Sequence, residues 1–394
     1  MEVKQIYTLI NSVSSEVVGR TDLVHEDLTG IVDLGNEVFN QNAVDNYVKS
    51  LVNHIGKVVF VNRPYSGKVP SVLMDAWEFG SVLEKISADV PQAEENDTWN
   101  LTDGTEYKQD VFHKPTVSAK FFNSKVTFEV PVSITERQVK ESFSSAAQLN
   151  GFLSMIYNAV EKSMTIKTDA LVMRTINNMI AETLDADKTA FGFVPSTNET
   201  VNYASASTVR CVNLLRLYNE KTGTHLEADA AITTPDFIRY AAYIMGLYSD
   251  RLQTISTLFN VGGKERFTPK DVLHTVLLSD FAAAAKTYLY ADTFHEDNVL
   301  LPKAETVASW QATGKDYAFN NVSKIDVKSA SGATVSISGV LGVMFDRDAL
   351  GVTNLDKRVT TNYNAKAEFF NNYYKFDAGY FNDTNENFVV FFIA

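Results

Sequence analysis

Apolar residues recur at helical spacing near the start of the chain. From residue 3 to residue 17 they lie three or four positions apart, and a turn-rich stretch follows at residues 19–35. A second stretch with the same spacing, residues 43–55, ends at Gly56, a residue that commonly terminates helices. Residues 1–58 therefore predict a helical arm, which either packs loosely or forms an N-terminal helical hairpin on the subunit's own core.

The strongest helical pattern lies at residues 135–182. Apolar residues form one stripe between Leu149 and Ile180, and Thr135 or Ser144 supplies the N-terminal cap. A helix of about 35 residues would be about 50 Å long at 1.5 Å per residue. No strict seven-residue repeat is present, so a coiled coil is not indicated. The pattern predicts a single spine helix, residues 136–185, across a flat subunit.

Residues 59–135 predict a long hairpin. A strand is expected at residues 57–61, and strict alternation predicts another at residues 126–132. Between residues 84 and 110 lie eight acidic residues but only two lysines, Lys85 and Lys108. A hairpin with a polar, acidic tip cannot bury both of its faces against its own chain. We therefore expect it to pack on a neighbour or to remain mobile.

The remainder mixes helices and strands. Within residues 186–335 we expect a helix at 204–217, a helix that starts at Thr234-Pro235 and runs toward residue 258, and buried strands at 272–278 and 288–290. Residues 336–394 return to strands, with a turn at 383–386 before the apolar strand 388–393. The predicted fold class is α+β.

Composition and charge narrow the function. The chain has 394 residues, 45% of them hydrophobic, and a formal net charge of -13, which argues against tight nucleic-acid binding as its main task. An acidic wall is nevertheless compatible with containing DNA. Cys211 is the single cysteine, so no intrachain disulfide forms. The sequence predicts no signal peptide and no membrane helix, and we expect a soluble protein made in a reducing cytoplasm.

Catalytic motifs are missing from the sequence. The six histidines show no metal-binding spacing, and no phosphate-binding or nucleophile motif occurs. Cys211 lies in a stretch predicted as an apolar helix, so we interpret it as a buried, unreactive thiol. We therefore expect no catalytic residue, no cofactor and no metal. Asp346-Arg347-Asp348, where a buried strand ends, is either an intrachain or an intersubunit salt-bridge node.

Four segments follow one another in a characteristic order: residues 36–59, residues 343–352, Tyr363-Asn364-Ala365-Lys366-Ala367-Glu368-Phe369 and Asp377-Ala378-Gly379-Tyr380-Phe381. In this order they resemble segments of the major capsid proteins of tailed bacteriophages, which have the Hong Kong 97 fold. Residues 36–59 are similar to the stretch that leads into the extended loop of podophage-type capsid proteins, and residues 343–352 resemble a capsid strand and turn. The resemblance covers residues 36–394.

The resemblance implies a domain division and a set of partners. It implies an N-terminal arm (1–58), an extended loop with flanking strands (59–135, the loop itself at about 62–130), a spine helix in a peripheral domain (136–185), an axial domain (186–335) and returning C-terminal strands (336–394). It also implies hexamers and pentamers that enclose double-stranded DNA in an icosahedral virion, a separate scaffolding protein and a portal, assembly in the host cytoplasm, and no membrane contact. The lysine–asparagine cross-links of some relatives are not assigned to Lys85, Lys108 or Lys114.

Candidate intersubunit contacts flank the acidic tip, because buried aromatic and aliphatic anchors dominate such interfaces. They are Leu73, Trp77, Phe79, Leu83 and Ile86, together with Asp346, Arg347 and Asp348. The alternative is that the apolar members complete the subunit's own core. The competing functions are a bacterial nanocompartment shell of the same fold, a tail-tube or decoration protein and, more distantly, an oligomeric enzyme.

Overall fold

The computed structural model describes residues 3–19, 46, 69–74, 83–91, 93, 95–96, 98–107, 112–135, 146–193, 201–290, 304–311 and 317–394. The chain forms two compact units. Unit 1 comprises Met1–Glu78, Lys125–Val172 and Val352–Gly379, and unit 2 comprises Phe79–Ser124, Met173–Gly351 and Tyr380–Ala394. Among the described residues, no helix is both long and apolar enough to cross a membrane.

Unit 1 is built on a four-stranded sheet with the order β1-β11-β12-β4. Side chains along β12 alternate between buried and half-buried, as a sheet with one covered face requires. Phe128 of β4 lies opposite Phe376 of β12, and their ring centroids are 5.0 Å apart. The strands are β1 (Leu73–Met74), β4 (Lys125–Thr135), β11 (Leu350–Asn364) and β12 (Phe369–Asn382).

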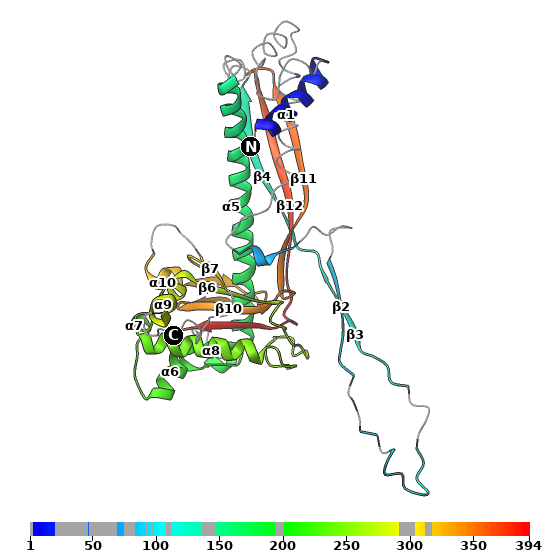
Figure 1. Cartoon of the computed structure of the whole chain (residues 1–394), viewed down its shortest axis with the longest axis vertical. Coiled ribbons are helices and arrows are strands. Elements are labelled where there is room, and N and C mark those ends of the chain that lie inside the picture. Colours follow the sequence, from blue (N-terminus) through cyan, green and yellow to red (C-terminus); the bar gives the residue numbers. More distant parts are fainter. Residues whose placement is uncertain are drawn as a thin grey trace. The chain divides into compact units, whose positions relative to one another are not determined.

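The predicted strand at residues 126–132 is confirmed. It forms β4, which pairs antiparallel with β12 along its whole length. Within the described part of the expected hairpin, the paired strands are β2 (Leu83–Ala88) and β3 (Val117–Phe122) (Figure 1). Alternation shows that a strand has one buried face but does not name the strand beside it. The strand expected at 57–61 lies outside the described residues.

Unit 2 contains a five-stranded sheet with the order β5-β13-β10-β6-β7. Its central strands β10 and β13 are buried at every position because both faces of the sheet are covered. The strands predicted near 272–278 and 388–393 are confirmed as β6 and β13, and β10 is one of the strands expected within residues 336–394. The five strands are β5 (Cys211–Asn213), β6 (Leu273–Leu278), β7 (Glu305–Val307), β10 (Val340–Asp346) and β13 (Phe388–Phe392).

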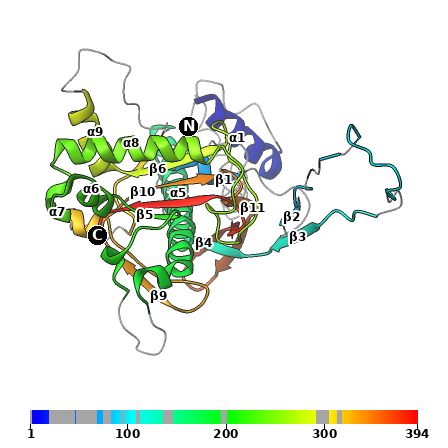
Figure 2. The same ribbon diagram turned by 90° about the horizontal axis from the view of Figure 1, so that it is seen from below.

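Three helices cover one face of this sheet: α6 (Leu214–Thr222), α8 (Pro235–Arg251) and α9 (Ser279–Tyr290) (Figure 2). Their apolar side chains form one core with Val389 and Phe391 of β13. On β5, Val212 belongs to this core, whereas its neighbour Cys211 must point to the opposite face. There its Sγ lies 3.6 Å from the carbonyl oxygen of Thr183, in the last turns of α5.

The predicted spine helix is confirmed as α5 (Ala146–Ala186), which has 41 residues and ends one residue beyond the predicted residue 185; residues 136–145 of the prediction lie outside the described residues. Of the two predicted N-terminal caps, Thr135 is wrong because it belongs to β4. Ser144 lies outside the described residues, so its role stays a prediction. In unit 2 the helix is fixed by buried polar contacts. Asn177 Nδ2 donates to the carbonyl oxygen of Trp310 at 2.8 Å.

Two predictions about short segments, one helix and one strand, are wrong. Residues 204–213 were expected to be helical, but α6 begins only at Leu214, with Asn213 as its cap, and Cys211 lies in strand β5. Conversely, the strand expected at 288–290 is the end of α9. Both segments are short and apolar, so local pattern does not distinguish helix from strand.

The predicted start of α8 at Pro235 is confirmed, and its end at Arg251 falls short of residue 258. Thr234 occupies the cap position, but its hydroxyl donates to the carbonyl oxygen of Ala230 at 2.8 Å instead of accepting from the helix. The remaining elements are α1 (Val3–Val17), as predicted, η1 (Pro70–Val72), η2 (Lys188–Phe191), η3 (Tyr203–Ser205), α7 (Ala228–Ala231), α10 (Phe319–Val322), β8 (Ile325–Lys328) and β9 (Thr334–Ile337). The helix expected at 43–55 lies outside the described residues except for Asn46.

Candidate assembly site

The β2–β3 hairpin has two chemically different faces. Along β2 the side chains of Leu83, Lys85 and Ser87 are half-buried, whereas those of Glu84, Ile86 and Ala88 are exposed. The same alternation continues on β3. Successive side chains of a strand point to opposite sides, so the hairpin presents one face to unit 2 and the other to solvent.

The solvent-facing side carries an apolar strip, which we call the outer face: Ile86, Val117 and Phe121. These side chains are 65%, 59% and 62% exposed. Residue pairs in the hairpin register place Ile86 opposite Ala119, Val117 opposite Ala88 and Phe121 opposite Glu84. Large apolar groups gathered on one exposed strand face are typical of a protein–protein contact.

The hairpin tip, residues 89–116, adds exposed aromatic and acidic groups. Trp99 is 95% exposed and Phe112 is 85% exposed. The tip is locally ordered by hydrogen bonds such as that from the Thr102 amide to the Tyr107 hydroxyl, 3.0 Å long. Seven acidic residues and two lysines in this range make it strongly negative. Such a tip suits a partner surface that is basic and partly apolar.

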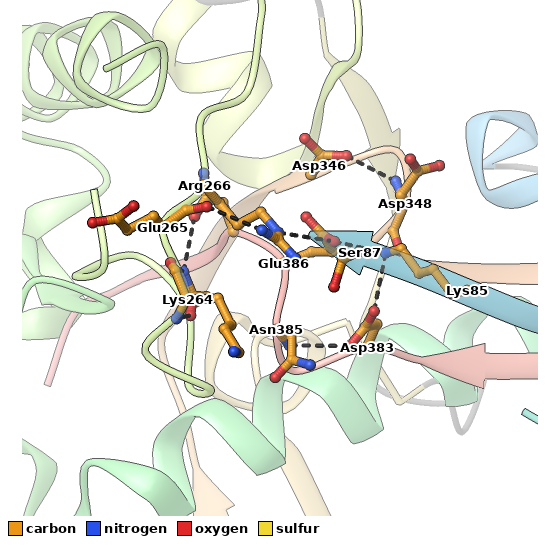
Figure 3. Close-up of polar contacts among 12 residues, drawn as sticks. Lys85, Ser87, Lys264, Glu265, Arg266, Asp346, Asp348, Asp383, Asn385 and Glu386 are labelled. Atoms are coloured by element: carbon orange, nitrogen blue, oxygen red, sulfur yellow. Dashed lines mark hydrogen bonds and ion pairs between the residues drawn. The ribbon is translucent and has the colours of Figure 1, made fainter. Parts of the chain in front are cut away.

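The opposite side of the hairpin is held by an ionic network (Figure 3). Lys85 Nζ lies 2.9 Å from Asp383 Oδ2 and 2.8 Å from Glu386 Oε1, and it also donates to the carbonyl oxygen of Asp348 at 3.0 Å. Lys120 Nζ, on the other strand, lies 2.9 Å from Asp383 Oδ1. Asp383 is thus bound by one lysine from each strand.

The loop before β6 extends this network. Arg266 Nε lies 3.3 Å from Glu386 Oε1, and Lys264 Nζ lies 3.1 Å from Asp89 Oδ1 at the start of the tip. Burial by itself raises the pKa of Asp383, but the charges and hydrogen bonds of Lys85 and Lys120 outweigh it, so that this pKa lies below its usual value. Asp383 is therefore ionised at neutral pH although its side chain is only 3% exposed.

Aromatic packing also holds the base of the hairpin. Phe122, the last residue of β3, packs on Phe381 near the end of β12, with ring centroids 5.1 Å apart. Lys120 Nζ lies 5.4 Å from the Phe122 ring centroid. The base of the hairpin is therefore fixed by both apolar and charged contacts, whereas the outer face has none of these partners.

The predicted contact residues fall in different places. Ile86 lies on the outer face, Leu83 is half-buried at the hairpin base, and Leu73 is half-buried in β1, where it pairs with Val352 of β11. Trp77 and Phe79 lie outside the described residues. An intersubunit role for this set stays a prediction.

The triplet Asp346-Arg347-Asp348 forms a turn after β10. Asp346 Oδ2 accepts a hydrogen bond of 2.8 Å from the Thr268 hydroxyl, and Asp346 Oδ1 accepts one of 2.9 Å from the Asp348 amide. Arg347 and Asp348 are exposed. In the described structure Asp346 thus stabilises a turn through hydrogen bonds. An intersubunit role for the two exposed residues stays a prediction.

Sequence reasoning missed the residues that hold the hairpin. Asp383 and Glu386 were recognised only as a turn, and Lys120, Val117 and Phe121 were not singled out. The alternation of residues 117–122 was a usable signal for the outer face. No local signal connects Asp383 with Lys85, because the pair is separated by 298 residues.

A second exposed surface lies on α5 in unit 1. Lys162 and Ile166, four positions apart, are exposed neighbours on one side of the helix, and the exposed Lys167 follows about 100° further round; Ile166 is 57% exposed. We call these three residues the α5 stripe. Its two positive charges and its apolar centre are complementary in character to the acidic, aromatic hairpin tip.

Other reactive groups in the described structure are packed. Cys211 is fully buried, and burial raises the pKa of its thiol. Within the described ranges no cluster of three or more His, Cys, Asp or Glu side chains is arranged to hold a metal. An open cavity of about 690 Å³ in unit 2 is lined by residues including Arg216, Glu220 and His225. The first two form an exposed ion pair of 2.7 Å.

The described structure thus combines a hairpin anchored at its base with an exposed apolar outer face. The family model for "Phi29-like phage major capsid protein" matches residues 8–392, and the chain belongs to this family. It is therefore a structural protein of the phage virion that self-assembles into the head shell. The predicted recognition, α+β capsid fold and capsid function are confirmed.

No curated protein matches the sequence. Among solved structures, a chain from the capsid of Staphylococcus phage Andhra matches with 8% identity and a TM-score of 0.49, covering 85% of this chain and 86% of that one. A chain from a structure of the head fiber and inner core protein gp22 of bacteriophage P68 matches with 9% identity and a TM-score of 0.48, covering 85% and 86%. A chain from the capsid of Cyanophage P-SCSP1u has 12% identity and a TM-score of 0.44, covering 85% and 90%.

Proposed function

We propose that this major capsid protein forms the hexamers and pentamers of an icosahedral head around double-stranded phage DNA. We also propose that the β2–β3 hairpin makes its main contact with a neighbouring subunit. The observation that carries this proposal is the outer face, where Ile86, Val117 and Phe121 are all more than half exposed. Isolated apolar side chains are normal on a surface, but three on one face of a narrow hairpin favour a partner.

The partner we propose is the α5 stripe of a second copy. The tip carries a net charge of about -5 if its seven acidic residues and two lysines are ionised. Lys162 and Lys167 supply opposite charge, and Ile166 supplies apolar area between them. A contact between two different surfaces of the same chain is heterologous, and such contacts generate closed rings when the rotation closes. Hexamers and pentamers are rings of this kind.

Electron microscopy of the full chain, expressed with and without a neighbouring scaffold gene, tests this proposal. We expect shells from the wild type and few or none from the double variant Lys162→Glu/Lys167→Glu. Combining it with Asp103→Lys/Glu106→Lys on the tip should restore assembly. The matched control, Lys286→Glu/Lys366→Glu, changes two exposed lysines on other elements and should assemble normally. Normal shells from the α5 double variant would exclude this contact.

The expected domain division remains part of the proposal. We propose five segments: the arm (1–58), the extended loop (59–135), the spine helix of the peripheral domain (136–185), the axial domain (186–335) and the returning strands (336–394). We also propose a separate scaffolding protein, a portal and assembly in the host cytoplasm. The net charge of -13 supports containment of DNA without sequence-specific binding.

We propose that the protein has no catalytic activity. The family is structural, and the described cavity near His225 is lined by an exposed ion pair instead of a buried cluster of titratable groups. The same family assignment favours a phage head over a bacterial nanocompartment shell. Incubation of assembled shells with hydrolase substrates should give no turnover above buffer.

A further inference from the structure

Lys85 and Lys120 lie directly opposite each other in the hairpin register. Like charges at such positions destabilise an antiparallel pair. In contact with the rest of unit 2 their side chains are only 21% and 38% exposed, so water screens the repulsion there incompletely. The hairpin therefore places an unfavourable pair at its base, which requires a counter-charge.

The counter-charge comes from the turn between β12 and β13. Asp383 places one carboxylate oxygen 2.9 Å from each lysine, and its Oδ1 also accepts from the Asn385 amide at 3.1 Å. Glu386 binds Lys85 and Arg266 together. The side chains of Asp383 and Glu386 are 3% and 11% exposed, so removing the cationic partners of either would leave a largely buried carboxyl group uncompensated.

We propose that the Asp383–Glu386 turn is a latch that sets the direction of the hairpin. When the lysines are seated on it, the repulsion within the hairpin and the cost of the buried carboxylates are both removed. When they leave, both penalties return together, so partial release is unfavourable and the hairpin is either seated or free.

The latch is mechanically coupled to the outer face. Lys85 and Ile86 are consecutive residues of β2 and point to opposite sides of the hairpin, so any tilt at the lysines moves the apolar strip with it. The consequence for shell geometry rests on the proposed intersubunit role of the hairpin. The latch itself is a property of the single subunit.

Hydrogen exchange of the unassembled full-length subunit tests the latch. In Asp383→Asn we expect the amides of β2 and β3 to exchange about tenfold faster than in the wild type, with β6 and β10 unchanged. The matched control is Asp377→Asn. That carboxylate also has a lowered pKa and accepts from Arg358 and Thr127 in unit 1, but it does not touch the hairpin. Equal exchange of β2 and β3 in the wild type and Asp383→Asn would overturn the proposal.

Two further variants keep the test decisive if Asp383→Asn does not fold. Lys120→Met leaves Asp383 with one cation and should produce a smaller increase in exchange. Adding Lys120→Met to Asp383→Asn should restore part of the protection, because the repulsion is gone. A merely structural role for Asp383 would not give this rescue, so its absence would count against the latch.

Assembly is measured separately on the same variants. Ile86→Asp should abolish shells without changing exchange at the hairpin base, which tests the proposed function alone. Faster hairpin exchange in Asp383→Asn supports the latch whether or not wild-type shells form. If that variant also forms shells of unchanged size and shape, the link between the latch and shell geometry is wrong.

Discussion

Gly339 and Ile393 approach each other so closely that no side chain fits between them. The Ile393 amide donates to the Gly339 carbonyl oxygen at 2.9 Å, and a Cβ added at Gly339 would lie 2.0 Å from the carbonyl oxygen of Ile393. Gly339 also has a φ of +83°, where residues with a Cβ are strained. This contact joins the start of β10 to the end of β13, at the centre of unit 2.

Gly339→Ala should destabilise the subunit by roughly 2–5 kcal/mol, combining the backbone strain with overpacking. The matched control is Gly332→Ala, because Gly332 has the same φ of +83° but nothing within 4 Å of the added Cβ. That variant should lose only about 1–2 kcal/mol. Urea unfolding of both variants measures the difference, and equal losses would show that the close approach is unimportant.

His274 should make the subunit less stable at mildly acidic pH. Burial lowers its pKa, Arg347 acts in the same direction, and Glu305 and Asp346 partly oppose them. Because the folded pKa lies below the unfolded value of about 6.5, its contribution to stability is complete above that value and falls as the pH drops below it. His274→Phe should flatten the dependence of unfolding free energy on pH between about 5 and 7. An unchanged slope would contradict this assignment.

Protonation of Asp383 should weaken the attachment of the hairpin, at a pH well below the range in which His274 titrates. Its folded pKa is depressed, so the stabilisation is present above the unfolded value of about 3.9 and is lost as the pH falls through the folded pKa. Exchange at the hairpin base should therefore be constant from neutral pH down to about 4 and accelerate below it, after correction for intrinsic rates. A loss of protection already near neutral pH would point to another group.

Cys211 should react with thiol reagents only when unit 2 opens. The side chain is fully buried, and burial raises the pKa of the thiol, so both access and thiolate are lacking in the folded subunit. Labelling should be negligible in buffer and should follow the unfolding curve in urea. Rapid labelling of the native subunit would show that β5, an edge strand, detaches from β13.

Trp77 is a predicted intersubunit contact that mutation can test. Trp77→Ala should impair shell formation more than subunit folding if the residue belongs to the intersubunit contact. Phe121→Ala on the described outer face should behave in the same way, because its side chain is 62% exposed in the subunit. Normal shells from Trp77→Ala, or a large loss of subunit stability, would place Trp77 outside the contact.

The sequence predicted helices and strands well where the apolar pattern was long or where a clear start or stop residue bounded it. The apolar stripe of α5 spans many turns, Pro235 marks the start of α8, and the apolar residues of β13 leave no alternative to burial. Predictions failed where a short apolar segment suits two states. Residues 211–213 form a strand because β13 offers a free edge, and residues 288–290 complete a helix begun at Ser279.

By itself the sequence determined the α+β class, the spine helix, the acidic excursion and the resemblance to phage capsid proteins, because each depends on local pattern or on order along the chain. Tertiary structure alone decided that β2 and β3 form the hairpin, that β4 joins β12, and that Asp383 binds two lysines from opposite strands. The last two pairings join residues more than 200 positions apart, and the period of a strand fixes its faces but not its neighbour.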